Sequence, residues 1–306
     1  MGLRGARLGL RNFARSAVLS SVSALRLNEL ALALRSASPA VNRIVVVAMH
    51  ETLSSNADQL RNQFDWVTKH FTIITPELFA KAFETKTRVW TGSKPAVLFT
   101  FDDGRESNYR VAAPLLESYG GRGIFFVPAK FIGLTGAAAK DFYYSRIDIR
   151  AETAPPEKSE SGEDVIWQPM TTEQLADLAR RGHWVGAHTL LHTKLLNLSV
   201  QELDREINES ARQIGLWTGK PVDAFAWAYS WDAIDRASWE AVKQVHRFCF
   251  SPCPGTVDPT KDSPLLIWRK EIESYYQPAE YRFMYSGLVD LVWAGKKRRL
   301  KQMLEH

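Results

Sequence analysis

Short apolar runs alternate with amphipathic segments along most of this 306-residue chain. Runs rich in β-branched and aromatic residues predict buried strands at 43–49, 71–75, 96–101, 123–127, 183–187, 224–228, 248–250 and 265–272. Between them, apolar residues at helical spacing predict helices at 56–70, from Pro76, at 108–119, from a cap at Thr171 or Thr172 to Gly182, at 200–216 and at 239–246. Strands alternating with helices favour an α/β fold with a parallel sheet.

Two segments fall outside this alternation. Residues 2–36 predict a helix with arginines on one side and apolar residues on the other, and Pro39 breaks it. Residues 152–164 are polar, acidic and rich in proline and serine, which predicts a mobile surface loop. We therefore divide the chain into a basic amphipathic N-terminal helical segment, 1–40, and one large α/β domain, 41–306.

Charge is unevenly placed along the chain. Residues 1–36 contain six arginines and one glutamate, which accounts for the whole net charge of +5. The remaining body is formally neutral, so nucleic-acid binding is not expected. A second basic cluster occupies residues 296–301. The two basic segments, 2–36 and 296–301, predict peripheral contact with an anionic membrane; alternatively, the N-terminal helix packs on the domain or frays.

The two cysteines do not form a recognisable framework. Cys249 and Cys253 are too few for a set of disulfides, and further zinc partners are not visible near them. We expect both to be small core or loop residues.

Chemically distinctive residues follow two of the predicted strands. The strand at 96–101 runs into Asp102-Asp103-Gly104, and the strand at 183–187 runs into His188, with His192 four residues later. One carboxylate and two imidazoles are a three-ligand set for a divalent metal with one position left open. The second carboxylate is a candidate general base. We expect the two histidines to share one face of a helical turn, and the whole set to support metal-assisted hydrolysis.

The segments Thr-Phe-Asp-Asp-Gly (100–104) and His-Thr-Leu-Leu-His (188–192) resemble the first two motifs of the polysaccharide deacetylases, also called the NodB-homology family or carbohydrate esterase family 4. The similarity extends over about residues 45–285. The resemblance implies a distorted (β/α)7-type barrel, a zinc-type metal and removal of acetyl groups from carbohydrate. It also implies that Asp102 is the catalytic base and that Asp103, His188 and His192 are the metal ligands.

The later motifs of the family are matched less closely. Tyr229 resembles the third-motif tyrosine whose backbone N–H stabilises the oxyanion, but Ala228 and Ser230 replace the usual proline and glycine. No Leu-x-His motif is present near the C-terminus. His50 instead resembles the histidine of the circularly permuted subgroup, which includes poly-N-acetylglucosamine deacetylases, and would be the general acid. The alternative for His50 is a hydrogen-bonded histidine at a strand end.

One arginine near the end of the chain also carries a resemblance. Arg269 resembles the fourth-motif arginine that orients the catalytic aspartate. The alternative is an arginine on the surface at a strand end. The neighbouring residues alone do not decide between these two interpretations.

We therefore expect a metal-dependent hydrolase that removes acetyl groups from N-acetylated sugars of a polysaccharide or its lipid-linked precursor. Zinc is the expected metal, although cobalt, nickel and iron accept the same donors. The alternatives are a catalytically impaired carbohydrate-binding protein on the same fold and a hydrolase of another non-peptide C–N bond. The resemblance implies a bacterial exopolysaccharide setting, and we expect a cytoplasmic or peripheral membrane location rather than secretion.

Overall fold

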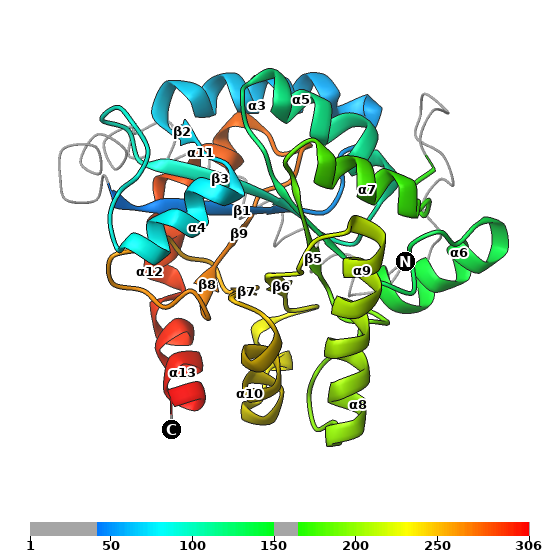
Figure 1. The fold of residues 1–306 in the computed structure, drawn as a ribbon. Coiled ribbons are helices and arrows are strands. Elements are labelled where there is room, and N and C mark those ends of the chain that lie inside the picture. Colours follow the sequence, from blue (N-terminus) through cyan, green and yellow to red (C-terminus); the bar gives the residue numbers. More distant parts are fainter. Residues whose placement is uncertain (1–41, 150–164, 306) are drawn as a thin grey trace, which may run out of the picture.

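The computed structural model describes residues 42–149 and 165–305 (Figure 1). The N-terminal segment 1–40 and the loop predicted at 152–164 lie outside these residues. The strands are β1 (Ile44–Met49), β2 (Thr72–Ile73), β3 (Ala96–Phe101), β4 (Ile124–Val127), β5 (Trp184–Ala187), β6 (Ala224–Ala226), β7 (Phe248–Ser251), β8 (Ile267–Trp268) and β9 (Lys270–Glu271). Each of these strands falls within or next to a run that the sequence predicts.

The strands form a nearly closed parallel barrel. Their order is β8-β7-β6-β5-β4-β3-β1-β9, with β2 beside β3, and every pairing in this order is parallel. The predicted last strand is split at Arg269 into β8 and β9. Its first half pairs with β7 and its second half with β1, so one short segment joins the two ends of the sheet. The distorted α/β barrel that the family resemblance implies is confirmed: seven strands form it when β8 and β9 are taken as one interrupted strand, and β2 lies beside β3.

Helices surround this barrel on the outside (Figure 1). They are α3 (Ala57–His70), α4 (Pro76–Thr85), α5 (Ala113–Ser118), α6 (Gly136–Phe142), α7 (Thr172–Arg180), α8 (Val200–Asp204), α9 (Ser210–Thr218), α10 (Arg236–Val245), α11 (Pro278–Ser286), α12 (Leu288–Val292) and α13 (Ala294–Glu305). A π-helical turn precedes α5 (Asn108–Ala112), follows α6 (Tyr143–Ile147) and joins α8 to α9 (Arg205–Glu209). Within the described ranges, no helix combines the length and apolar character needed to cross a membrane.

Local sequence accounts for several helix starts. The Thr171 hydroxyl accepts a hydrogen bond from the Gln174 N–H, and the Gln174 side chain accepts one from the Thr171 N–H, which forms the capping box at α7. Ser199 and Glu202 form the same arrangement at α8. Helices α6 and α11–α13 were not predicted, because their sequences lack a strong apolar period. Local signals still mark the start of α11, where Pro278 is the first helical residue and the Glu280 side chain accepts a hydrogen bond from the Gln277 N–H.

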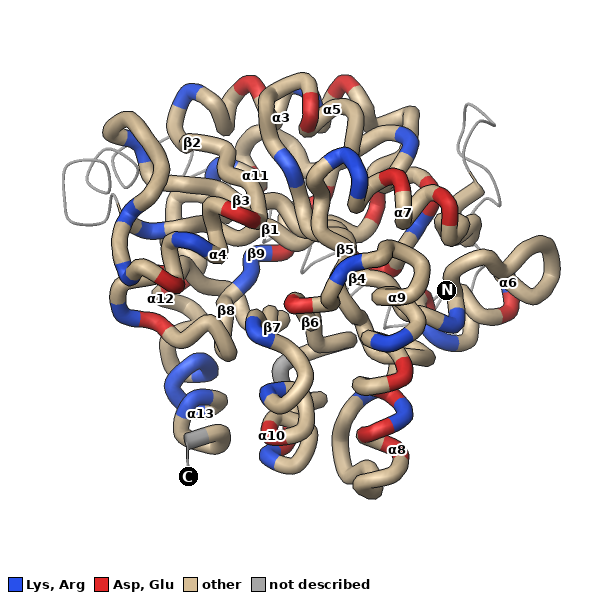
Figure 2. Tube along the Cα trace, viewed as in Figure 1, with Lys and Arg blue, Asp and Glu red and all other residues tan. Residues whose placement is uncertain are grey.

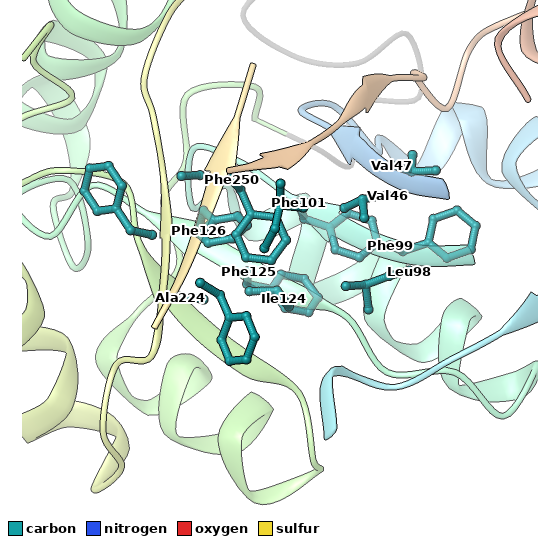
Figure 3. Packing of buried hydrophobic residues seen from close by; sticks show 14 of the residues in the cluster. Val46, Val47, Leu98, Phe99, Phe101, Ile124, Phe125, Phe126, Ala224 and Phe250 are labelled. Carbon is teal, nitrogen blue, oxygen red and sulfur yellow. The ribbon is translucent and has the colours of Figure 1, made fainter. Parts of the chain in front are cut away.

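The core lies inside the barrel and between the barrel and its helices. Every residue of β1 and β3 is buried, as expected for parallel strands that are covered on both faces. Phenylalanine rings fill much of the core, and the rings of Phe101 and Phe125 stack with centroids 4.8 Å apart (Figure 3). Cys249 and Cys253 are buried and free, which confirms them as core residues.

Candidate active site

The predicted site residues come together where the parallel strands end. His50 follows β1, the two aspartates follow β3, His188 follows β5, Tyr229 comes shortly after β6, and Arg269 separates β8 from β9. The Asp102 N–H donates to the Met49 carbonyl over 2.8 Å, so it extends the β1–β3 pairing by one residue. The two aspartates are thereby placed directly beside the end of β1.

Three buried side chains form a cluster of potential metal donors. The Nε2 atoms of His188 and His192 lie 3.7 Å and 3.5 Å from the same Asp103 oxygen, Oδ1. The Nδ1 of His188 donates to the Ala226 carbonyl over 2.8 Å, and the Nδ1 of His192 donates to the Arg146 carbonyl over 2.7 Å. A carbonyl oxygen can only accept, so Nδ1 carries the proton in each ring. Nε2 is therefore the nitrogen of each ring that faces Asp103 and could bind a metal.

This donor set fits a divalent ion. Burial lowers the pKa of His188 to about 4, so its ring is neutral near pH 7. Burial alone would raise the pKa of Asp103, but nearby His50 and His192 outweigh it and lower that pKa below its usual range. Metal ligands must be deprotonated, and a ligating histidine usually donates its other N–H to an oxygen. Asp103 and His188 meet the first condition, and both histidines meet the second.

The two histidines lie on an irregular loop, and the predicted helical turn is wrong. Thr189 and His192 have φ angles of 63° and 54°, in the left-handed region, which a β-branched residue such as Thr189 rarely adopts. A helix is impossible with these angles. The Thr189 carbonyl accepts from the Ser210 hydroxyl over 2.9 Å, and the Thr189 hydroxyl accepts from the Thr193 N–H over 2.9 Å. These bonds hold a conformation that the residues alone would avoid.

Glu206 is the strongest support of this loop, and the sequence interpretation missed it. Its Oε2 accepts the N–H groups of Leu190 and Leu191, each over 3.0 Å. The carboxylate is buried and comes from the π-helical turn between α8 and α9. The sequence does contain a signal for Glu206, which is an acidic residue on the apolar face of the helix predicted at 200–216. It is next to Ile207 and three residues after Leu203.

Asp102 lies beside the donor cluster and is bound by an arginine from the segment that joins the two ends of the sheet. The Arg269 Nη1 donates to Asp102 Oδ1 over 2.7 Å and to the Thr100 hydroxyl over 3.2 Å. Both Arg269 and Asp102 are about 3% exposed in their side chains. Burial would raise the pKa of Asp102, but Arg269 outweighs it and holds the pKa at about 2. Arg269 is therefore a buried site residue rather than a surface arginine.

His50 is paired with a carboxylate that the sequence interpretation also missed. The His50 Nδ1 donates to Glu273 Oε1 over 2.7 Å, and the His50 N–H donates to Glu273 Oε2 over 3.0 Å. Burial lowers the pKa of His50, but Glu273 outweighs it and raises the pKa to about 10. The other ring nitrogen, Nε2, lies 3.8 Å from Asp102 Oδ2. Glu273 comes just after the predicted last strand, so the strand-end pattern that selected His50 also applies to it.

Comparison with known proteins agrees with this geometry. The sequence model of the polysaccharide deacetylase family matches residues 90–246, which is half of the chain. The chain belongs to this polysaccharide deacetylase family. The match includes Asp102, Asp103, His188, His192 and Tyr229, but it does not reach His50 or Arg269.

Individual relatives are more distant. YxkH of Bacillus subtilis (strain 168), whose name describes a polysaccharide deacetylase, is 27% identical over 120 residues, or 39% of this chain. That match spans about a third (32%) of the length of YxkH. IcaB from Ammonifex degensii superposes with a TM-score of 0.58 at 20% identity, covering 80% of this chain and 95% of IcaB. The BpsB deacetylase domain from Bordetella bronchiseptica superposes with a TM-score of 0.55 at 18% identity, covering 76% of this chain and 97% of that domain. These likenesses show a shared fold.

The π-helical turn that follows α6 also contributes to the site. The carbonyl of Arg146 accepts from both His192 Nδ1 and the Tyr229 hydroxyl, the latter over 2.5 Å. The Tyr229 ring also lies against His192, with centroids 4.7 Å apart. Tyr229 adopts a left-handed backbone conformation, with a φ of 64°. It does so although Ala228 and Ser230 replace the usual proline and glycine beside it. One backbone oxygen in this chain therefore positions two predicted site residues.

A second arginine, also missed, closes the site next to Asp103. The buried Arg105 places Nη2 3.6 Å from Asp103 Oδ2 and donates from Nη1 to Glu51 over 3.5 Å. Its guanidinium also lies over the Tyr143 ring, 4.9 Å from the centroid. The Asp103 carboxylate thus has the histidines on one oxygen and an arginine on the other. Arg105 is two residues after Asp103, and only the folded chain shows that its side chain turns back.

Proposed function

We propose that this protein is a metal-dependent hydrolase that removes acetyl groups from N-acetylated sugars of a polysaccharide or its lipid-linked precursor. The observation that carries the proposal is the cluster of Asp103, His188 and His192 beside Asp102, which Arg269 keeps ionised. Membership of the polysaccharide deacetylase family supports the same reaction. The names of the solved neighbours, which include a BpsB deacetylase domain, agree with it.

Asp103, His188 and His192 would hold the metal, for which zinc is the first candidate and cobalt, nickel or iron are alternatives. When bound, such an ion supplies Lewis acidity toward water and the acetyl carbonyl. The remaining chemistry belongs to side chains. Asp102, ionised at any pH well above its pKa of about 2, would accept the proton of the attacking water.

The leaving amine needs a proton, and His50 would supply it. Glu273 raises the pKa of His50 to about 10, so its ring carries a proton on each nitrogen near neutral pH. The Nδ1 proton is held by Glu273, which leaves the Nε2 proton, on the side of Asp102, for transfer. After turnover, Asp102 releases its added proton to solvent and His50 takes up a proton from solvent, which restores the starting state.

Tyr229 would act through its backbone. Its N–H would donate to the oxyanion of the tetrahedral intermediate, as the family resemblance implies. The Tyr229 hydroxyl is bound to the Arg146 carbonyl, and this bond fixes the ring and therefore the adjoining turn. A hydrogen bond can thus contribute the rigidity that the usual proline and glycine would supply at positions 228 and 230.

The test is acetate release from N-acetylglucosamine oligomers by protein that has been stripped with a chelator and then resupplied with zinc or cobalt. The proposal predicts metal-dependent acetate release by the wild-type protein and none by Asp102→Asn. Saccharide binding without acetate release would support the alternative of a catalytically impaired binding protein, which the exchanged residues Ala228 and Ser230 suggest. Release of formate or ammonia in place of acetate would indicate a hydrolase of another C–N bond.

A further inference from the structure

The C-terminal helices carry an exposed apolar pair next to a run of cations. Leu291 and Val292, at the end of α12, are each 75% exposed. Among the described residues they are the only two consecutive large hydrophobic residues on the exposed surface. Single exposed apolar residues are normal on proteins, but an adjacent pair this open to water is a feature to be explained.

The cations belong to the helix that follows. Residues 291–304 contain five lysines and arginines and no acidic residue. Lys296, Arg298 and Arg299 are exposed, and the first turns of α13 are blue in Figure 2. The acidic residue just before this stretch, Asp290, is engaged by Lys270 over 2.8 Å. We call the surface formed by Leu291, Val292, Lys296, Arg298 and Arg299 the basic apolar patch.

Helical geometry places both kinds of side chain on one face. The Trp293 N–H donates to the Val289 carbonyl over 3.2 Å, and the Lys297 N–H donates to the Trp293 carbonyl over 3.0 Å, so helical hydrogen bonding continues from α12 into α13. Leu291 and Arg298 are seven residues apart, as are Val292 and Arg299. A spacing of seven is close to two helical turns, which stacks these residues along the same outward face.

The opposite face of α13 is fixed to the domain. Leu300 and Leu304 are buried, and the Lys297 ammonium lies over the Trp268 ring, 5.7 Å from its centroid. Trp268 is in β8, directly before the site arginine. The basic apolar patch is therefore held rigidly on the deacetylase domain.

We propose that the basic apolar patch docks this protein on an anionic lipid surface. A helix with apolar residues and cations on its outward face binds such a surface by inserting the apolar side chains among the acyl chains and pairing the cations with head groups. A nucleic acid would use the cations but leave Leu291 and Val292 in water. A second copy of the chain would bury the apolar pair only by bringing like charges together. Anionic lipid can bind both the apolar pair and the cations of the patch.

Vesicle co-sedimentation of the full chain tests this proposal. The wild-type protein is expected to bind vesicles of phosphatidylcholine with phosphatidylglycerol, to bind pure phosphatidylcholine much less, and to be released by salt. Each cation near an anionic surface contributes roughly fivefold to binding, so Arg298→Glu with Arg299→Glu should lower the partition coefficient at least about tenfold. Leu291→Ser with Val292→Ser should lower it by about tenfold as well, because the inserted apolar area is lost.

Matched controls come from elsewhere on the surface. Val200 and Leu216 are 78% and 69% exposed, and changing both to serine removes similar apolar area away from the patch. Arg180 and Lys261 have exposed side chains, and changing both to glutamate alters the net charge as the Arg298 and Arg299 pair does. These controls should bind like the wild type, and all variants should unfold at the same temperature by circular dichroism.

Three results would overturn the proposal. The first is unchanged binding by both patch variants, which would place any membrane contact in residues 2–36, since every variant retains them. The second is an equal loss in the matched controls. The third is a wild-type dimer in sedimentation velocity that Leu291→Ser dissociates, because the patch would then belong to a second copy.

Discussion

Glu206 provides the sharpest test of how the candidate metal site is held. The perturbation is Glu206→Ala, which removes the buried carboxylate that accepts the N–H groups of Leu190 and Leu191. Both of these residues lie between the two histidines, so their backbone positions determine where the imidazoles point. Removing Glu206 leaves a buried backbone donor, on Leu190, and a part-buried one, on Leu191, without their acceptor.

The expected magnitude follows from these two bonds. A hydrogen bond to a charged group contributes about 1.5–3 kcal/mol, and an unsatisfied buried donor costs a similar amount. Water can enter the space left by alanine and recover part of this cost, so we expect Glu206→Ala to lower the free energy of unfolding by about 3 kcal/mol. Loss of an outer-shell partner typically lowers metal affinity by roughly 10–100-fold, and we expect a change in that range for zinc.

The assay has two independent readings. Urea unfolding in the presence of chelator gives the stability of the metal-free protein, and calorimetric titration with zinc gives the dissociation constant. Glu206→Gln keeps an acceptor oxygen and should preserve most of the stability and most of the zinc affinity. Glu202→Ala is the matched control, because Glu202 is four residues earlier and only caps α8; it should change stability much less than Glu206→Ala and leave zinc affinity unchanged.

Two outcomes would refute the reasoning. Wild-type stability of Glu206→Ala would mean that its hydrogen bonds contribute nothing net. A full loss of stability with wild-type zinc affinity would mean that the loop keeps its shape without Glu206, so that the carboxylate supports the fold but does not position the histidines.

Three further predictions use other parts of the molecule. Asp103→Ala should abolish tight zinc binding in calorimetry, whereas Asp102→Asn should retain binding but lose turnover; zinc binding by Asp103→Ala at wild-type affinity would contradict the ligand assignment. Burial lowers the pKa of His246 to about 4, below about 6.5 in the unfolded chain, so its contribution to stability should fall by up to about 1.4 kcal/mol per pH unit from about pH 6.5 down to 4. Urea titrations of His246→Asn across this range should show a shallower decline, and an unchanged slope would exclude His246 as its source. Gly186→Ala should lower the free energy of unfolding by about 2 kcal/mol or more, because a Cβ there would lie 2.5 Å from the Phe126 ring; a melting temperature equal to that of the wild type would show that the ring moves aside freely.

Local pattern along the chain predicts much of this protein. The apolar run before Asp102 predicted β3 with its observed bounds, because a buried parallel strand needs continuous apolar residues. The strand-end rule also brought His50 and His188 to one edge of the barrel, because all parallel strands end on the same side. Such features depend only on neighbours in the chain, so the sequence determined the fold class and most of the candidate site.

The tertiary structure decided what local pattern left open or missed. A spacing of four suggested a helical turn for His188 and His192, but bonds from Glu206 and Arg146 hold a left-handed loop instead. Whether Arg269 belongs to the site depended on how the barrel closes, since its partner Asp102 is 167 residues away in the chain. Hydrogen bonds and ion pairs between distant segments form only once those segments are packed together, and local periodicity carries no record of them.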